Sequence, residues 1–290
     1  MRRATASSEG GFTLTELAVV TVIVALLLAS AMYTLTAQTD QRNYEETQRR
    51  LAQARDLVLA FAIANGRLPC PARYTSAASN SAGLESFCAA ASGTCAGAET
   101  TTKPTSPEHG NCSDHYDGYL PAASIGFTPT DSTGFAVDAW NNRIRYAVTG
   151  VTPASVPTGT SCTAAVPIFT SGTYLKTYGV ACQPNDLLIC RSSTGISASS
   201  CTTTANQLMA PNLIAAVLFS PGKNYSTATD ATTAAAAGRT DEAANLDGNA
   251  TFVFHTPTPS DAANGEFDDQ FAWITAGELY SRLVAAGVLP

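Results

Sequence analysis

The residue with the clearest chemical potential is Glu16, an isolated acid at the head of a long apolar stretch. From Phe12 to Ala37 it is the only side chain that is charged at neutral pH. An ionised carboxylate on an apolar helix is costly, by roughly 2.5–3.5 kcal/mol at the centre of a bilayer on insertion scales and less near an end. Glu16 therefore needs either a partner of opposite charge or access to water.

A cleavage immediately before Phe12 creates such a partner. The α-amine that it exposes has a reference pKa near 8, so it is a cation at neutral pH. In a staggered bundle of identical helices, the amine of one subunit can meet Glu16 of a neighbour. The alternative is that Glu16 reaches water at the cytoplasmic interface without a partner.

The apolar run 17–32 predicts a helix that crosses a membrane, because a helix over 12–37 is long enough for the roughly 30 Å hydrocarbon layer. Arg2 and Arg3 precede it, which favours an N-terminus in the cytoplasm. A secretory signal peptide is the competing interpretation. The run is longer than a usual signal-peptide core and contains an acid, and both features argue against that interpretation.

The segment Gly11-Phe12-Thr13-Leu14-Thr15-Glu16, followed by the apolar run, resembles the N-terminus of type IV pilins and type II secretion pseudopilins. The resemblance implies that a prepilin peptidase cleaves after Gly11 and methylates the new amino group on Phe12. It also implies that Glu16 acts in assembly. Many relatives place a proline about twenty residues into the mature helix, where this chain has Tyr33, so a proline-driven break is not expected here.

The resemblance further implies a lollipop-shaped α+β fold. A long N-terminal helix, with a membrane-spanning first half, is expected to pack on a mainly antiparallel, disulfide-rich β head. The expected segments are a leader peptide over 1–11, the transmembrane half of the helix over 12–37, its amphipathic half over 38–66 and the globular head over 67–290.

The amphipathic half of the helix has an apolar stripe at helical spacing, which predicts that it covers the head. Asn65 and Gly66 then supply a helix stop. The stripe consists of Leu51, Ala54, Val58 and Phe61, with Leu57 and Ala62 beside them.

Within the head, 213–220 is a strand candidate, and its residues 213–219 are apolar throughout, which predicts a central strand buried on both faces. The run from Asp138 to Tyr146 resembles the D-x-W-G-N-x-x-x-Y element of pseudopilins and predicts a turn entering a strand, with Trp140 and Tyr146 in the core. Asn141 stands where the glycine usually lies, and asparagine tolerates a positive φ. Further strands are expected over 166–170, 187–190 and 251–255.

The chain is expected to close with a helix. Thr275 and Glu278 have the spacing of a capping box, and Gly287 follows as a helix stop.

All eight cysteines lie between Cys70 and Cys201, and no pair has C-x-x-C spacing. An even number beyond a membrane helix indicates disulfides in an oxidising compartment, not a zinc site. Spacing leaves many pairings open. It favours a nested pattern: Cys88–Cys95 and Cys182–Cys190 as local loops, enclosed by Cys70–Cys112 and Cys162–Cys201.

Composition and motifs narrow the function classes. The formal net charge is -7 and no Lys/Arg cluster occurs, so nucleic acid is not an expected partner. The sequence lacks the H-E-x-x-H, G-x-S-x-G and G-x-G-x-x-G motifs. The three histidines, His109, His115 and His255, have no motif partner near them. The chain is therefore expected not to be an enzyme.

A C-terminal acidic loop is a candidate calcium site, because some pseudopilins bind calcium there. Carboxylate oxygens are the ligands that calcium prefers, although the spacing does not match an EF-hand and solvated acidic loops are common. The candidate ligands are Asp261, Glu266, Asp268 and Asp269. The spacing His109-x-x-Cys112-x-x-His115 raises a second metal hypothesis, but in an oxidising compartment Cys112 is expected in a disulfide.

The resemblance predicts a minor pilin that assembles into a type IV pilus filament, with a structural, adhesive or priming role. A type II secretion pseudopilin is the alternative, and a membrane-anchored periplasmic enzyme or binding module is a further one. The expected location is the bacterial inner membrane in a single pass, with a periplasmic head that becomes extracellular in a filament. The expected partners are other pilin subunits, prepilin peptidase, an inner-membrane assembly platform and the lipid bilayer.

Overall fold

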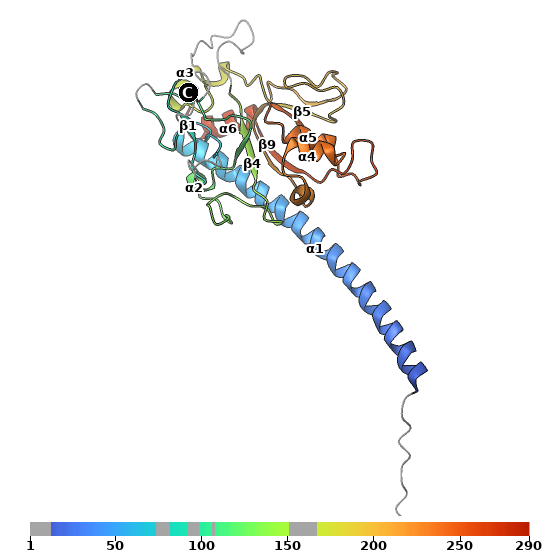
Figure 1. Cartoon of the computed structure of the whole chain (residues 1–290). Coiled ribbons are helices and arrows are strands. Elements are labelled where there is room, and N and C mark those ends of the chain that lie inside the picture. Colours follow the sequence, from blue (N-terminus) through green and yellow to red (C-terminus); the bar gives the residue numbers. More distant parts are fainter. Residues whose placement is uncertain are drawn as a thin grey trace, which may run out of the picture. The chain divides into compact units, whose positions relative to one another are not determined.

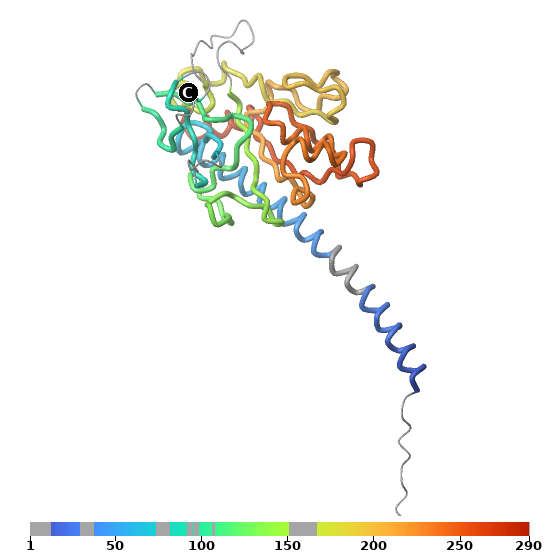
Figure 2. Tube along the Cα trace, viewed as in Figure 1, coloured from blue at the N-terminus to red at the C-terminus, as the bar shows by residue number. Residues whose placement is uncertain are grey.

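The computed structural model describes residues 13–73, 82–91, 95, 99–105, 108–150 and 167–289, and within the first range the side chains of 30–37 are not described. These described residues are coloured in Figure 2. By internal contacts the chain divides into two units, Met1–Glu45 and Glu46–Pro290. Gly11, Phe12 and Cys162, three residues of predicted function, lie outside the description.

Helix α1 runs over Leu14–Asn65. It contains no glycine or proline, and Gly66 follows it with a φ of 68°, the left-handed conformation that commonly ends helices. Its residues up to Glu45 belong to the first unit and those from Glu46 to the second. The part of the expected amphipathic half from Glu46 onward is thus counted in the same unit as the head, whereas 38–45 belong to the first unit.

The expectations of a membrane-spanning half over 12–37 and of a single-pass inner-membrane location are wrong. Among the described residues, no helix combines the length and the apolar character needed to cross a bilayer. Thr15, Glu16 and Thr21 interrupt the apolar residues in the first part of α1. The expected fold class is corrected accordingly: the chain is α+β with a β-rich, disulfide-bonded body.

Four strands form the main antiparallel sheet, in the order β3-β4-β7-β9. All seven residues of β7 are buried, so the predicted central strand is confirmed. The strands are β3 (Gly118–Tyr119), β4 (Arg145–Val148), β7 (Ile214–Ser220) and β9 (Gln270–Thr275).

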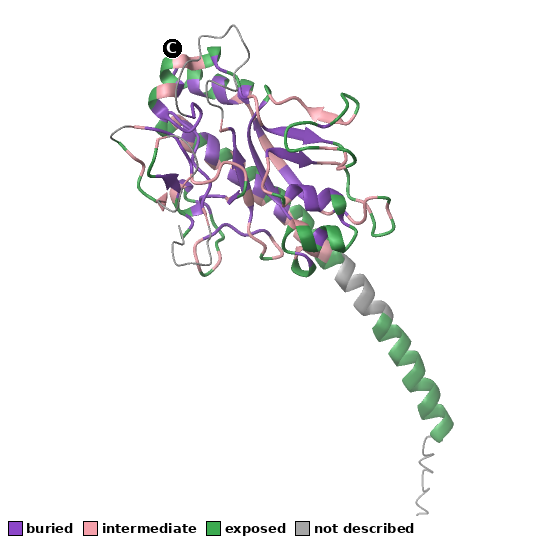
Figure 3. Cartoon of the chain, turned by 45° about the horizontal axis from the view of Figure 1, so that its top comes forward, coloured by how far each residue is buried: buried purple, intermediate pink, exposed green. Residues whose placement is uncertain are grey.

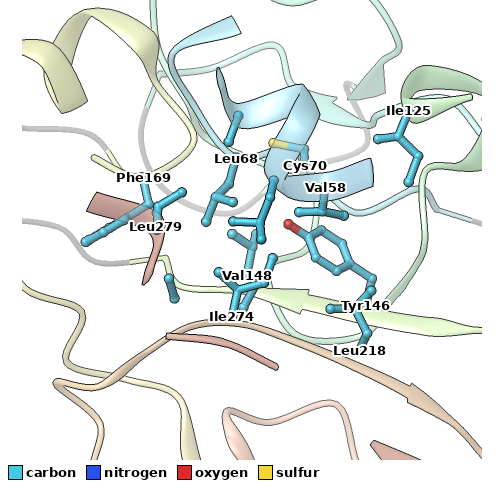
Figure 4. Close-up of a cluster of buried hydrophobic side chains, with 14 of the residues drawn as sticks. Val58, Leu68, Cys70, Ile125, Tyr146, Val148, Phe169, Leu218, Ile274 and Leu279 are labelled. Carbon is cyan, nitrogen blue, oxygen red and sulfur yellow. The ribbon is translucent and has the colours of Figure 1, made fainter. Parts of the chain in front are cut away.

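One face of this sheet is covered by the head portion of α1 and by α6 (Ala276–Ala285). Figure 4 shows Val58 of α1, Tyr146 of β4 and Leu218 of β7 among the side chains of this core. Burying a side chain of this size contributes about 1.5–3 kcal/mol. Four members of the predicted stripe are buried and the other two, Leu57 and Phe61, pack partly buried against the core; the four are Leu51, Ala54, Val58 and Ala62.

A second sheet covers the opposite face, in the order β6-β5-β8, with β5 parallel to β8 and antiparallel to β6. Aromatic side chains fill the space between the sheets: the rings of Phe219 and Phe271 stack with centroids 5.1 Å apart, and Phe252 lies beside both. Figure 3 shows buried residues on the strands of both sheets. The strands are β5 (Leu188–Cys190), β6 (Gln207–Met209) and β8 (Thr251–Val253).

Short elements occupy the connections, and α4 and α5 lie together beside β5 in Figure 1. The expected strand over 166–170 is not a strand in its described part, 167–170, where turns precede α3. The elements are β1 (Phe87–Cys88), β2 (Glu99–Thr100), α2 (Ala122–Ile125), α3 (Gly172–Tyr178), η2 (Gly179–Ala181), η3 (Asn224–Thr227), α4 (Ala231–Ala236) and α5 (Thr240–Asn245).

Local predictions at two turns agree with the structure. Asn141 has a φ of 67°, as expected of the residue in the glycine position. Tyr146 is fully buried, whereas Trp140 is only half-buried and was wrongly expected in the core. Thr275 caps α6 by accepting a hydrogen bond from the backbone N–H of Glu278. The Glu278 carboxylate pairs with Arg55 of α1.

The disulfides agree with half of the predicted pattern. Cys70–Cys112 and Cys88–Cys95 are confirmed. Cys190 pairs with Cys201, so the predicted Cys182–Cys190 and Cys162–Cys201 pairs are wrong. Cys182 is also disulfide-bonded. Three disulfides between described cysteines favour an oxidising compartment, periplasmic or extracellular.

A buried ion pair joins the end of α1 to the first cysteine loop. The guanidinium of Arg67 donates to both carboxylate oxygens of Glu85, at 2.6 and 2.9 Å. The backbone N–H of Cys70 donates to the same carboxylate at 2.7 Å. Both charged residues are less than a tenth exposed, so loss of either partner leaves an uncompensated buried charge.

We expect Glu85→Gln to lower the free energy of unfolding by about 3–5 kcal/mol, because Arg67 keeps its charge in a buried place. Denaturant titration of the full-length protein measures the loss. Arg49→Gln is the matched control, since the Arg49 side chain is 77% exposed in its pair with Glu46. Such a pair contributes about 0–1 kcal/mol. Equal losses in the two variants would contradict the assignment.

Candidate functional site

Glu16 lies in the first turn of α1, where it closes a reciprocal cap with Thr13. The Thr13 backbone N–H and hydroxyl donate to Glu16 Oε2 at 2.9 and 2.8 Å, and the Glu16 backbone N–H donates to the Thr13 hydroxyl at 3.3 Å. This is the capping box T-x-x-E. This cap was not among the predictions, although the T-x-x-E spacing of Thr13 and Glu16 is present in the sequence.

The cap keeps Glu16 ionised. The hydrogen bond from the Thr13 backbone lowers the pKa of the Glu16 carboxyl below its ordinary value. The side chain is exposed, so it can also accept a further donor or cation. Glu16 is therefore a charged group at the start of α1, beside the predicted cleavage position at Gly11 and Phe12.

A second candidate site lies where three carboxylates converge in the head. Asp268 and Asp269 precede β9 and Glu242 comes from α5, and one carboxylate oxygen from each lies within 4.8 Å of the others. Among the described residues, this is the one such group of three or more possible ligands. The structure thus brings together two of the four predicted calcium ligands. Asp261 and Glu266 are not in the group.

Glu242 was not a predicted ligand, although the sequence shows it beside Asp241 in an acidic run. Its Oε1 accepts hydrogen bonds from the side chain of Asn224 at 2.8 Å and from the backbone N–H of Asp268 at 2.9 Å. Its Oε2 lies 3.3 Å from the guanidinium of Arg239. Only the tertiary fold places the α5 acid against the start of β9.

The turn after β7 holds Asp268 from the other side. The backbone N–H groups of Lys223 and Asn224 donate to Asp268 Oδ2 at 3.0 and 3.1 Å. Gly222 has a φ of 69°, and a Cβ there would lie 1.8 Å from Asp268 Oδ1. The turn therefore requires glycine, both for its backbone conformation and for the close approach of the carboxylate.

Burial makes these carboxylates weak acids. It raises the pKa of Glu242 to about 7 and that of Asp268 to about 6. Burial, followed by the nearby charge of Glu242, raises the pKa of Asp269 well above its ordinary value. Like charges at this separation disfavour simultaneous ionisation, so the cluster either keeps protons or takes up a cation.

The oxygen atoms of the cluster suit a hard cation such as calcium. Calcium takes six to eight oxygen ligands at 2.3–2.6 Å, so oxygens on opposite sides of the ion lie about 4.8 Å apart. Asp268 Oδ1 and Asn224 Oδ1 are enclosed and lack a hydrogen-bond partner within the described structure. Glu242, Asp268 and Asp269 would hold the ion, which would neutralise their charge.

We expect the free energy of unfolding of the metal-free protein to fall as the pH rises, because the contribution of protonated Glu242 is lost. The folded pKa of about 7 exceeds the ordinary value of 4.5. The folded chain thus binds this proton more tightly, and the contribution is complete below about pH 4.5 and lost as the pH rises through about 7. Melting temperatures in chelator from pH 5 to 8 measure it. Glu242→Gln should flatten the slope, whereas an unchanged slope contradicts the assignment.

We expect calcium to raise the melting temperature at pH 7.5 by roughly 5–10 °C at a hundredfold excess over its dissociation constant. Glu242→Gln paired with Asp269→Asn should abolish the rise. Asp261→Asn is the matched control and should keep it, because Asp261 is exposed and outside the cluster. A rise that survives the double substitution would place the cation elsewhere.

The chain was compared with family models, curated proteins and solved structures, and none matches. Both candidate sites therefore rest on the residues and geometry of this chain. The resemblance of residues 11–16 to the pilin N-terminus stays a resemblance.

Proposed function

We propose that this chain is a pilin-like filament subunit that assembles through the N-terminal part of α1. The observation that carries the proposal is the exposed apolar surface of the first unit. Leu14 is 85% exposed, Leu17 61% and Leu27 65%. Contiguous apolar surface of this kind marks a binding surface, because leaving it in water is unfavourable.

The same helix of another copy is the partner that this surface fits. Its exposed apolar side chains lie all around the helix, and a helix that is apolar all round is stable when neighbours enclose it. They include Val19, Val20, Val22, Ile23, Val24, Leu26 and Leu28. A bundle of identical helices would bury them without any contribution from the head.

An ion pair at Glu16 would fix the axial register between neighbouring helices in such a bundle. Cleavage after Gly11 by a prepilin peptidase would free the α-amine of Phe12. Glu16 of a neighbouring subunit would form an ion pair with that amine. An ion pair becomes stronger as the surrounding dielectric falls, so packing apolar helices around it favours the paired register. The lowered pKa of Glu16 supports the proposal, because the group is ionised before a partner arrives.

The head would be displayed on the filament as a disulfide-bonded domain. Its bulk favours a minor subunit of a type IV pilus, with an assembly platform and prepilin peptidase as further partners. Assembly through Glu16 and Phe12 is also the chemistry of a type II secretion pseudopilin. Recovery of the chain from sheared surface filaments, in place of the periplasm alone, distinguishes the pilus from the pseudopilin.

We expect Glu16→Gln to reduce incorporation into filaments at least tenfold. Glutamine serves at the third helical position of a capping box as well as glutamate does, so this substitution removes the charge and keeps the cap. Immunodetection of the chain in sheared filaments measures incorporation. Mass spectrometry of the mature N-terminus should show N-methyl-phenylalanine at Phe12.

Glu45→Gln is the matched control, since Glu45 is an exposed acid on the same helix that accepts a hydrogen bond from Gln41. Its incorporation should equal that of the unmodified chain. Undiminished incorporation of Glu16→Gln would remove the proposed pairing. Retention of Met1 in the assembled protein would remove the proposed processing.

A further inference from the structure

Asp241 of α5 joins three segments of the head that are far apart in the sequence. Its Oδ1 accepts a hydrogen bond from the backbone N–H of Ser193 at 2.6 Å, in the turn after β5. Asn264 donates its side-chain amide to the same carboxylate at 3.1 Å. His255 reaches Oδ2 through Nε2 at 3.0 Å. Asp241 is only 4% exposed, so this buried carboxylate depends on these partners.

The second ring nitrogen of His255 also faces an acceptor. Nδ1 lies 2.7 Å from the carbonyl oxygen of Thr256. A carbonyl oxygen cannot donate a proton, and the Asp241 carboxylate acts as an acceptor toward Ser193 and Asn264. Both contacts can therefore be hydrogen bonds only when both ring nitrogens carry protons, which makes the ring an imidazolium cation.

The His255 ring contacts an aromatic ring and an acidic side chain. The His255 ring stacks on Phe267 with centroids 4.0 Å apart, an arrangement in which an aromatic face attracts positive charge. Among the described residues, the ionisable side chain in contact with the His255 ring is that of Asp241. Arg239, which precedes α5, pairs with Glu242 of that helix at 3.3 Å. The remaining polar groups around Asp241, Ser193 and Asn264, are neutral.

These contacts hold the loop between β8 and β9. Thr258 and Phe267 exchange backbone hydrogen bonds at 3.1 Å, and the N–H of Thr240 donates to the carbonyl of Asn264 at 3.1 Å. His255 stands at the beginning of this loop, and Phe267 at its end. The loop over 255–267 is thus attached to α5 through the contact between His255 and Asp241 and a few neutral hydrogen bonds.

We propose that His255 is a pH-sensitive clamp, which fixes the 255–267 loop to α5 when the imidazole is protonated and loosens it when the proton leaves. Histidine is the side chain whose charge ordinarily changes between pH 5 and 8. Loss of the proton leaves one ring nitrogen with a lone pair facing an oxygen, and it leaves Asp241 buried without a counter-charge. The clamp is independent of the filament function proposed for α1.

The test is hydrogen exchange of the full-length protein in chelator at pH 5.5 and pH 8.0, corrected for intrinsic rates. The amides of Thr240, Thr258 and Phe267 should lose at least tenfold in protection at pH 8.0 relative to those of β7. NMR of the His255 ring should show both nitrogens protonated at pH 5.5. A neutral ring at pH 5.5, or equal protection at both pH values, overturns the proposal.

Two variants separate the clamp from the neighbouring carboxylates. His255→Gln cannot carry charge and should give weak protection of the loop at both pH values. Glu242→Gln removes an acid of the adjacent cluster and should keep the pH dependence. If Glu242→Gln abolishes the dependence instead, the carboxylate cluster is responsible and the clamp is wrong. If His255→Gln fails to fold, the ring NMR of the unmodified protein decides alone.

Discussion

Complete burial of β7 on both faces is the constraint from which the rest of the head follows. Alternate side chains of this strand point into two different cores: Leu218 faces α1 and α6, while Val217 and Phe219 face the second sheet. A strand with no polar face must be covered twice, because exposed apolar surface on either side costs about 25 cal/mol per Å². The three-layer arrangement of helices, sheet and sheet satisfies that requirement.

The same burial gives the ends of the strands their chemistry. The turn after β7 and the segment before β9 meet at the end of this strand pair, and there Asp268 and Asp269 are taken largely out of water. A carboxylate in such a place loses hydration, so it holds its proton or needs a cation. The weak acidity of the cluster is thus a consequence of the layered fold. The buried carboxylate of Asp241 is instead contacted by the His255 ring and by neutral N–H donors.

The first unit has the opposite character, because its apolar side chains remain exposed within the unit. Glu16 combines two tasks there. It closes the cap that starts α1, and it keeps a charge at the end of an apolar surface. A neutral residue at this position could preserve the helix and still lose the means to set a register between copies. The residues that support assembly are therefore separable from those that stabilise the head.

Short-range patterns in the sequence determined much of the local structure. The apolar run of β7, the Thr275 cap, the stripe from Leu51 to Ala62 and the left-handed Asn141 all follow from periodicity or turn chemistry within a few residues. The remaining features depend on contacts between different segments of the chain. The spacing of two residues along the sequence does not by itself determine whether they meet in the fold. Only the tertiary structure shows that Cys190 pairs with Cys201, that Glu242 contacts Asp268 and that His255 contacts Asp241. Each of these contacts joins segments whose meeting depends on how the two sheets and α5 pack.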